Sequence, residues 1–189
     1  QTLDIVQKHS DSYRVVSMTA GRNLDLLRQQ IRQFRPGFVS VVSESDRDVI
    51  AREFPELQLG CGEQGNIDAV GFGDSDVVVV GIVGFAALAP TLQAVRLKKR
   101  IALANKESLV VAGHLLKAEA KISKAEIIPV DSEHSAVFQA MQAGRRAEVQ
   151  RIILTASGGP FLRYPADQLA NVTVNEALAH PNWSMGPKI

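Results

Sequence analysis

Short, entirely apolar segments that alternate with helix-like segments constrain the fold of this chain more than any other feature. Val77–Val80 and Ile101–Ala104 lack the polar alternation of a strand with one face in solvent, so each is predicted to be a strand covered on both faces. Between them, Leu92 and Val95 keep helical spacing. Because strand and helix alternate in this way, the sequence predicts an α/β fold with a Rossmann-like, doubly wound parallel sheet.

Local signals place the other elements. Asn23 is predicted to cap a helix, Ser108 another, and Thr173 with Glu176 to form a capping box. The apolar pattern predicts further strands at residues 15–18, 38–42, 57–61, 127–130 and 149–155, and further helices at 2–6, 24–34, 45–54, 67–70, 108–120 and 135–141.

Composition excludes several classes of function. The net charge is +1, so there is no basic field that would hold nucleic acid. Cys61 is the only cysteine, which rules out an intrachain disulfide and suits a cytoplasmic protein. The longest apolar run, residues 82–90, is interrupted by Gly84 and is too short to cross a bilayer, so no membrane partner is expected.

The segment Glu126–His134 carries two acids directly after a predicted strand. Ligands bind at the carboxyl edge of an open α/β sheet. If the segment stays extended, Asp131 and Glu133 point to the same side, and a buried pair of carboxylates needs a cation. The alternative is that Asp131 or Ser132 caps a helix and Glu133 lies in its first turn.

Two other strand ends carry polar residues. Asn105, Lys106 and Glu107 follow the strand that ends near Ala104, where the lysine could polarise a substrate oxygen or form a solvated ion pair with Glu107. Gly21-Arg22-Asn23 follows the strand at 15–18, at the position that reads the adenosine ribose in a dinucleotide fold. Arg22 there favours NADP over NAD, although an exposed arginine after a glycine is also a common structural feature.

The C-terminal part offers weaker signals. Ser157-Gly158-Gly159 presents successive backbone N–H groups that suit a phosphate, or makes a plain tight turn. His180 reads as a substrate contact or a histidine at a helix C-terminus. Trp183, in a loop flanked by proline and glycine, reads as a lid over a substrate or as an anchor in a small core.

Four motifs occur in one order along this chain: Ala104-Asn105-Lys106-Glu107-Ser108, Pro129-Val130-Asp131-Ser132-Glu133-His134, Ser157-Gly158-Gly159-Pro160-Phe161 and His180-Pro181-Asn182-Trp183-Ser184-Met185-Gly186. Together they resemble the 1-deoxy-D-xylulose 5-phosphate reductoisomerase family, with spacing kept over residues 2–189. The resemblance implies rearrangement of the substrate with a divalent metal and its reduction by NADPH to 2-C-methyl-D-erythritol 4-phosphate, in isoprenoid-precursor synthesis.

The resemblance also implies a role for each matching residue. Asp131 and Glu133 would hold Mg²⁺, Mn²⁺ or Co²⁺, and both, with Lys106, would be catalytic. The implied substrate contacts are Lys106, Ser132, Glu133, Ser157, His180 and Trp183, and the implied NADPH contacts are Gly21, Arg22, Asn23, Asn105, Glu107 and Gly186.

The resemblance further implies two domains, a homodimer and missing parts. Residues 1–130 would form the NADPH-binding domain and residues 131–189 the beginning of an α+β catalytic domain. The family's first strand and glycine-rich turn are expected before Gln1, and further metal and phosphate ligands after Ile189, so the 189-residue piece is expected to have little activity by itself. Competing hypotheses are another NADP-dependent dehydrogenase, similar to homoserine dehydrogenase, and a noncatalytic nucleotide-sensing module.

Overall fold

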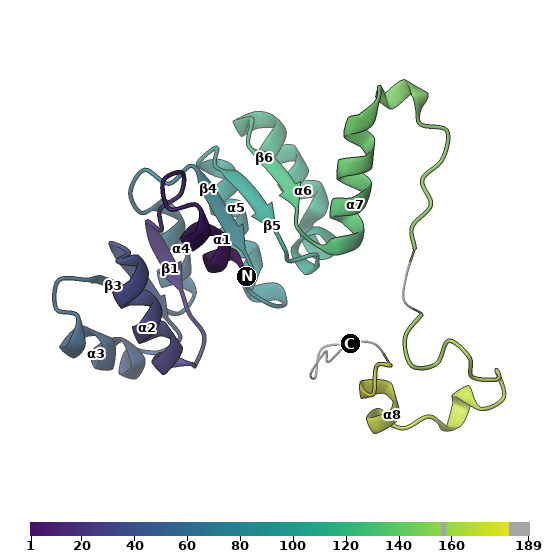
Figure 1. The fold of residues 1–189 in the computed structure, drawn as a ribbon, viewed down its shortest axis with the longest axis horizontal. Helices are drawn as coiled ribbons and strands as arrows, with labels where there is room; N and C mark the ends of the chain where they lie inside the picture. The colour runs from purple at the N-terminus through teal and green to yellow at the C-terminus, as the bar shows by residue number, and fades with distance from the viewer. Residues whose placement is uncertain (156–157, 182–189) are drawn as a thin grey trace. The chain divides into compact units, whose positions relative to one another are not determined.

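The computed structural model describes residues 1–155 and 158–181, which fall into two compact units, residues 1–138 and 139–189 (Figure 1). Helices and strands alternate through the first unit, as predicted. They are α1 Thr2–Lys8, β1 Ser17–Thr19, α2 Leu24–Phe34, β2 Phe38–Val41, α3 Glu44–Glu53, β3 Gln58–Cys61, α4 Gly62–Gly71, β4 Val77–Val80, η1 Phe85–Ala87, α5 Leu88–Arg96, β5 Arg100–Leu103, α6 Glu107–Ser123, β6 Glu126–Pro129 and α7 Ser132–Ala140.

Every described strand is paired in parallel, which confirms the predicted fold class. The strands form two three-stranded sheets with the orders β1-β2-β3 and β4-β5-β6. Among the described strands, β1, β3, β4 and β6 each have only one neighbour. A parallel ladder needs a crossover between successive strands, and the intervening helices provide it.

Helix α4 links the two sheets of the first unit. The Ser17 hydroxyl on β1 donates a 2.6 Å hydrogen bond to the Ala69 carbonyl of α4, and Val70 packs into the core beside β4 and β5. The two cores are otherwise separate. One contains Leu27, Ile31, Val39, Val41, Ile50 and Phe54, and the other contains Val70, Val80, Ala87, Ala94, Val95, Ile101, Leu103 and Leu116.

The prediction that β4 is covered on both faces is wrong. Val80 is buried, whereas Val77 and Val79 are 44% and 45% exposed. Side chains of successive strand residues point to opposite faces, so α5 and α6 cover one face of this sheet and the described chain leaves the other partly open. An apolar strand sequence indicates what the strand can bury, and only its neighbours in space decide what it does bury.

The prediction of a strand over Val149–Thr155 is also wrong. These residues form no strand, and Ile152, Ile153 and Leu154 are exposed. An apolar segment becomes a strand only where a neighbouring strand completes its hydrogen bonds, and no described segment does so here.

Several predicted boundaries shift. The first strand begins at Ser17 rather than residue 15, and the helix predicted at residue 135 begins at Ser132. The caps at Asn23 and at Thr173 with Glu176 are confirmed. Beyond α7 the described elements are short: η2 Met141–Ala143, η3 Arg146–Glu148, η4 Leu169–Asn171 and α8 Val174–Leu178.

No helix of the described ranges has the length and apolarity needed to span a membrane. The division between the two compact units falls within α7, after Phe138. The predicted domain boundary at residue 130 stays a prediction.

Candidate functional site

The carboxyl ends of β4, β5 and β6 meet at one edge of their sheet. Val80, Leu103 and Pro129 are aligned in register across the three strands. The ladder continues one residue further, because Ala104 N–H donates to the Val80 carbonyl (3.0 Å) and Val130 N–H to the Leu103 carbonyl (2.9 Å). The turns that follow the three strands therefore lie at the same edge, where ligands bind in open α/β sheets.

The side chain of Asn105 fixes the turn between β5 and α6 through hydrogen bonds. It is 2% exposed. Its side-chain amide donates to the carbonyls of Ile82 and Gly84 (2.9 and 3.0 Å) and to Oε2 of Glu107 (3.0 Å). Its Oδ1 accepts from the N–H and the hydroxyl of Ser108 (2.9 and 2.6 Å). Both hydrogens and the oxygen of the carboxamide are thus used within the protein, and the turn after β4 is tied to the start of α6.

The prediction that Ser108 caps α6 is wrong. Helix α6 begins at Glu107, and Ser108 lies inside its first turn, fully buried. Asn105 performs the capping instead, because its Oδ1 accepts the hydrogen bond from the Ser108 N–H. Asparagine and serine are both good capping residues, so the sequence allowed either choice.

Lys106 and Asp131 bring the second and third turns together. The Lys106 ammonium lies 2.8 Å from Oδ2 of Asp131, and Nδ1 of His134 lies 3.3 Å from Oδ1. The Asp131 side chain is 13% exposed, whereas those of Lys106 and His134 are 52% and 49% exposed. Both carboxylate oxygens of Asp131 therefore have a partner that solvent can reach.

This contact shifts both ionisable groups toward their charged forms. The hydrogen bond from Lys106 holds the pKa of Asp131 below its ordinary value of 3.8, against partial burial, with smaller effects from the charges of Lys106 and His134 and from a contact with Glu133. The pKa of Lys106 is raised, chiefly by the hydrogen bond to Asp131, and Glu107 and Glu133 act in the same direction. The carboxylates of Asp131, Glu107 and Glu133 thus all favour the charged form of this ammonium group.

The segment with Asp131 and Glu133 is not extended, so that prediction is wrong. The Asp131 carbonyl accepts from the Ser135 N–H (2.8 Å), and Ser132 and Glu133 lie in the first turn of α7. This is the alternative that the sequence left open. Glu133 nevertheless stays close enough to Asp131 to affect its pKa. A helix start places both acids at the sheet edge, because the strand leads directly into the helix.

The donor set suits a hard divalent cation in part. Carboxylate oxygens are the ligands that Mg²⁺ and Mn²⁺ prefer, and Mg²⁺ sites commonly use one or two carboxylates completed by water and substrate oxygens. Asp131 and Glu133 supply such a pair. No group of three or more His, Cys, Asp or Glu side chains within residues 1–155 and 158–181 is arranged to hold a metal ion. The described residues therefore fit a metal that water and substrate help to bind.

The turn after β1 contains Gly21, Arg22 and Asn23. Oδ1 of Asn23 accepts from the Leu26 N–H (3.0 Å), which fixes the start of α2. Arg22 is exposed and has no ion-pair partner in the described part of the chain. Its guanidinium group is therefore available to an anion.

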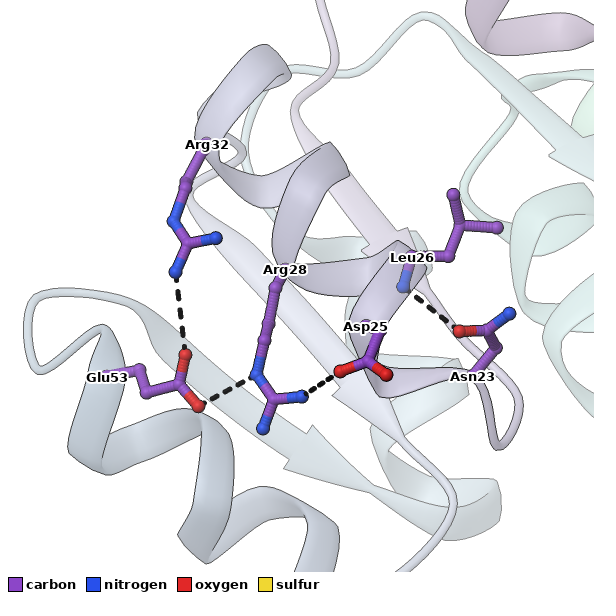
Figure 2. A network of polar contacts seen from close by, with 6 residues as sticks. All are labelled: Asn23, Asp25, Leu26, Arg28, Arg32 and Glu53. Atoms are coloured by element: carbon purple, nitrogen blue, oxygen red, sulfur yellow. Dashed lines mark hydrogen bonds and ion pairs between the residues drawn. The ribbon is translucent and has the colours of Figure 1, made fainter.

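A network of charged side chains connects α2, the helix that follows this turn, to α3 (Figure 2). Arg28 lies between Asp25 (2.7 Å) and Glu53 (2.8 Å), and Arg32 reaches the other oxygen of Glu53 at 3.7 Å. Because Arg28 bridges the first turn of α2 and the last residue of α3, the network holds the helix that begins beside Arg22.

Sequence reasoning missed two features of the site. His134 was not assigned a role, although its position three residues after Asp131 places the two side chains together when a helix begins there. Gly81 and Gly84, which follow β4, were not assigned to the site. A Cβ at Gly21, Gly81 or Gly84 would meet nothing within 4 Å, so the backbone after β1 and β4 is open to close approach by a ligand.

The second unit contains the remaining predicted contacts. His180 follows α8, with its N–H donating to the Leu178 carbonyl (3.1 Å). Ser157, Trp183 and Gly186 lie outside the described residues. The structure thus brings Asn105, Lys106, Glu107, Asp131, Ser132 and Glu133 to one sheet edge, with Gly21, Arg22 and Asn23 at the edge of the other sheet.

The fold and these turns define an α/β protein with parallel sheets whose polar residues gather at the carboxyl ends of the strands. Sequence profiles identify it further: the profile described as 1-deoxy-D-xylulose 5-phosphate reductoisomerase matches residues 1–113, and the profile for the C-terminal domain of the same enzyme matches residues 127–189. The chain belongs to the 1-deoxy-D-xylulose 5-phosphate reductoisomerase family.

Curated relatives named 1-deoxy-D-xylulose 5-phosphate reductoisomerase match along the whole chain. Those from Halalkalibacterium halodurans and Geotalea uraniireducens are 49% and 50% identical over 190 and 194 residues, which is 100% of this chain and 50% and 49% of the relatives. The relative from Bacillus subtilis is 47% identical over 194 residues. The chain thus spans about half the length of these relatives.

Solved structures of the family have the same fold. A DOX-P reductoisomerase in complex with NADPH, fosmidomycin and magnesium matches 98% of this chain and 49% of its own, with a TM-score of 0.85 and 37% identity. The enzyme from Zymomonas mobilis in complex with NADPH matches 95% of this chain and 48% of its own, with a TM-score of 0.88 and 35% identity.

Proposed function

We propose that the protein to which this chain belongs converts 1-deoxy-D-xylulose 5-phosphate to 2-C-methyl-D-erythritol 4-phosphate, using NADPH and a divalent metal, in isoprenoid-precursor synthesis. The observation that carries the proposal is the meeting of Lys106, Asp131 and Glu133 at the sheet edge of a chain that matches this family from end to end. Solved structures of relatives are complexes with NADPH, fosmidomycin and magnesium, and with NADPH.

Asp131 and Glu133 are the proposed metal ligands. A divalent cation held there would act as a Lewis acid on substrate oxygens. Lys106, Ser132 and Glu133 would contact the substrate, since all three lie at the start of α6 or α7. Ser157 and His180 would contact the phosphate end of the substrate, and Trp183 would cover it and keep water away from the reaction.

The turns after β1 and β5 are the proposed NADPH site. Gly21, Arg22 and Asn23 would bind the adenosine end, where the Arg22 cation suits a 2′-phosphate. Asn105 and Glu107 would line the site beside Lys106, together with Gly186. Because the Asn105 carboxamide is already saturated by the protein, its contribution is to shape the turn that approaches the cofactor.

In this proposal, residues 1–130 form the NADPH-binding domain and residues 131–189 begin the catalytic domain. We also propose that the whole protein is a cytoplasmic homodimer. The dimer rests on membership of the family, and the compartment on the lone cysteine, Cys61. Light scattering of the whole protein measures the molar mass and tests the dimer.

The sharpest test of the function is Asp131→Asn in the whole protein. This change keeps the size of the side chain and removes the charge that a metal needs, so metal-dependent turnover is expected to fall by about 100-fold or more. The matched control is Glu126→Gln, which removes the same charge from the opposite end of β6, where Glu126 pairs with Arg100 at 2.7 Å.

The two variants separate the competing functions. Full activity of Glu126→Gln with loss of activity in Asp131→Asn supports the proposed enzyme. Undiminished NADPH oxidation by Asp131→Asn would instead indicate a dehydrogenase that needs no metal pair. NADPH binding by the wild type without any turnover of 1-deoxy-D-xylulose 5-phosphate would indicate a nucleotide-sensing module.

A further inference from the structure

The contact between Lys106 and Asp131 joins a proposed substrate contact to a proposed metal ligand. The ammonium lies 2.8 Å from Oδ2 of Asp131. We propose that Lys106 is an internal counter-ion that holds Asp131 until a divalent cation displaces it, so that metal binding releases the Lys106 ammonium to the substrate. This inference rests on the metal site of the proposed function and adds an order of events to it.

One carboxylate cannot serve both cations well. A divalent cation bound through Oδ2 would share that oxygen with the Lys106 ammonium, which now lies 2.8 Å from it. Two cations on the same oxygen also repel each other. The Lys106 ammonium therefore opposes metal binding through Oδ2.

The structure lets Lys106 move while Asp131 stays. The Lys106 side chain is 52% exposed, and a half-exposed ion pair of this kind contributes little to stability. Asp131 is 13% exposed, and its other oxygen lies 3.3 Å from Nδ1 of His134. Its backbone carbonyl also holds the first turn of α7 through Ser135. Asp131 is thus the more buried partner, on a backbone held by α7, and Lys106 is the more exposed partner that can leave.

A second ion pair links β5 and β6 through an arginine rather than a lysine. Arg100 pairs with Glu126 at 2.7 Å, at the opposite ends of the same two strands. Arginine can bind a carboxylate with two parallel hydrogen bonds, whereas lysine is a single charge on a flexible stem. A lysine at the functional edge suits a contact that has to be exchanged.

The test measures Mn²⁺ binding to the whole protein without substrate, by electron paramagnetic resonance of the free ion. Lys106→Met removes the competing cation, so it is expected to bind Mn²⁺ about threefold to fivefold tighter than the wild type. Lys106→Arg keeps a cation that can pair with two oxygens, so it is expected to bind Mn²⁺ no more tightly than the wild type.

Lys117→Met is the matched control, because it removes the same charge from an exposed position further along α6. It is expected to leave the affinity for Mn²⁺ within twofold of wild type. Because Lys106 is half-exposed, Lys106→Met is expected to fold, and Lys106→Gln gives a second neutral variant if it does not. Neutral variants at position 106 that bind Mn²⁺ no more tightly than Lys117→Met would overturn the inference.

Asp131→Asn distinguishes this inference from the proposed function. If the wild type binds Mn²⁺ and Asp131→Asn does not, the metal site stands, and the position 106 variants decide whether Lys106 competes for it. If Asp131→Asn binds Mn²⁺ as well as the wild type, or the wild type binds none, the metal site is wrong and the counter-ion role of Lys106 is wrong with it.

Discussion

Two neighbouring turns of the same sheet edge are built in opposite ways. The turn after β5 is centred on Asn105, which is 2% exposed and makes all its hydrogen bonds with the protein. The turn after β6 is centred on Asp131, whose carboxylate is bound by the half-exposed side chains of Lys106 and His134. The side chain at the centre of the first turn is bound only within the protein interior, whereas the carboxylate at the centre of the second turn can exchange its partners.

The difference shows how a rigid part and an adaptable part can share one site. A buried polar group with every partner satisfied fixes the backbone around it, because breaking any of its bonds leaves a donor or acceptor unpaired. An ion pair near solvent loses little when it breaks, because water solvates both charges. Asn105 thus fixes the position from which Lys106 extends, and Asp131 remains open to a change of partner.

The largest effect on stability is expected from Asn105→Ala. The change leaves two carbonyls and the Ser108 N–H without their partner, so the free energy of unfolding is expected to fall by about 3 kcal/mol. Urea denaturation followed by circular dichroism measures it. Thr91→Val is a control for losing one buried hydrogen bond, the 2.6 Å contact with Ala87. An Asn105→Ala protein as stable as the Thr91→Val protein would contradict the inference that the hydrogen bonds of Asn105 fix this turn.

A smaller effect is expected from Ser108→Ala. This variant loses only the hydroxyl that donates to Oδ1 of Asn105, while the Ser108 N–H still donates to the same oxygen. The free energy of unfolding is expected to fall by about 1 kcal/mol. If it falls as far as in Asn105→Ala, the Ile82 and Gly84 contacts contribute nothing measurable, and the turn is held by its serine alone.

A still smaller effect is expected in the open turn. A double-mutant cycle of Lys106→Met and Asp131→Asn, in EDTA, is expected to give a coupling energy of about 0.5 kcal/mol, because the pair is partly solvated. High salt should reduce this coupling. A coupling energy that approaches the loss in Asn105→Ala would remove the contrast between the two turns.

The pH dependence of this pair gives the finest test. The pKa of Asp131 is lowered and that of Lys106 is raised, so the pair contributes stability between the ordinary values of 3.8 and 10.5. The contribution is lost as pH falls through the lowered pKa of Asp131 or rises through the raised pKa of Lys106. In EDTA, Asp131→Asn is therefore expected to be less stable than the wild type at pH 6. This difference should disappear in acid, below the pKa of Asp131.

Much of the fold could be predicted because its signals are local. The caps at Asn23 and Thr173 and the apolar strands near Val80 and Leu103 depend on residues close in sequence. The strand predicted at 149–155 and the covered second face of β4 failed because both depend on what lies beside them in space. Burial and strand pairing depend on which residues are close in space, and the periodicity of a sequence does not identify those residues.

By itself, the sequence determined the class of the fold and the strand ends at which polar residues gather, because apolar runs, helical spacing and parallel connections place Asn105 and Asp131 after strands. Only the tertiary structure decided what each residue does there. It buried the side chain of Asn105 where its hydrogen bonds fix a turn, placed Asp131 at the start of a helix and brought Lys106 into contact with Asp131. The physical reason is that hydrogen bonds and ion pairs act over a few ångströms, whereas these partners are separated by more than 20 residues in the chain.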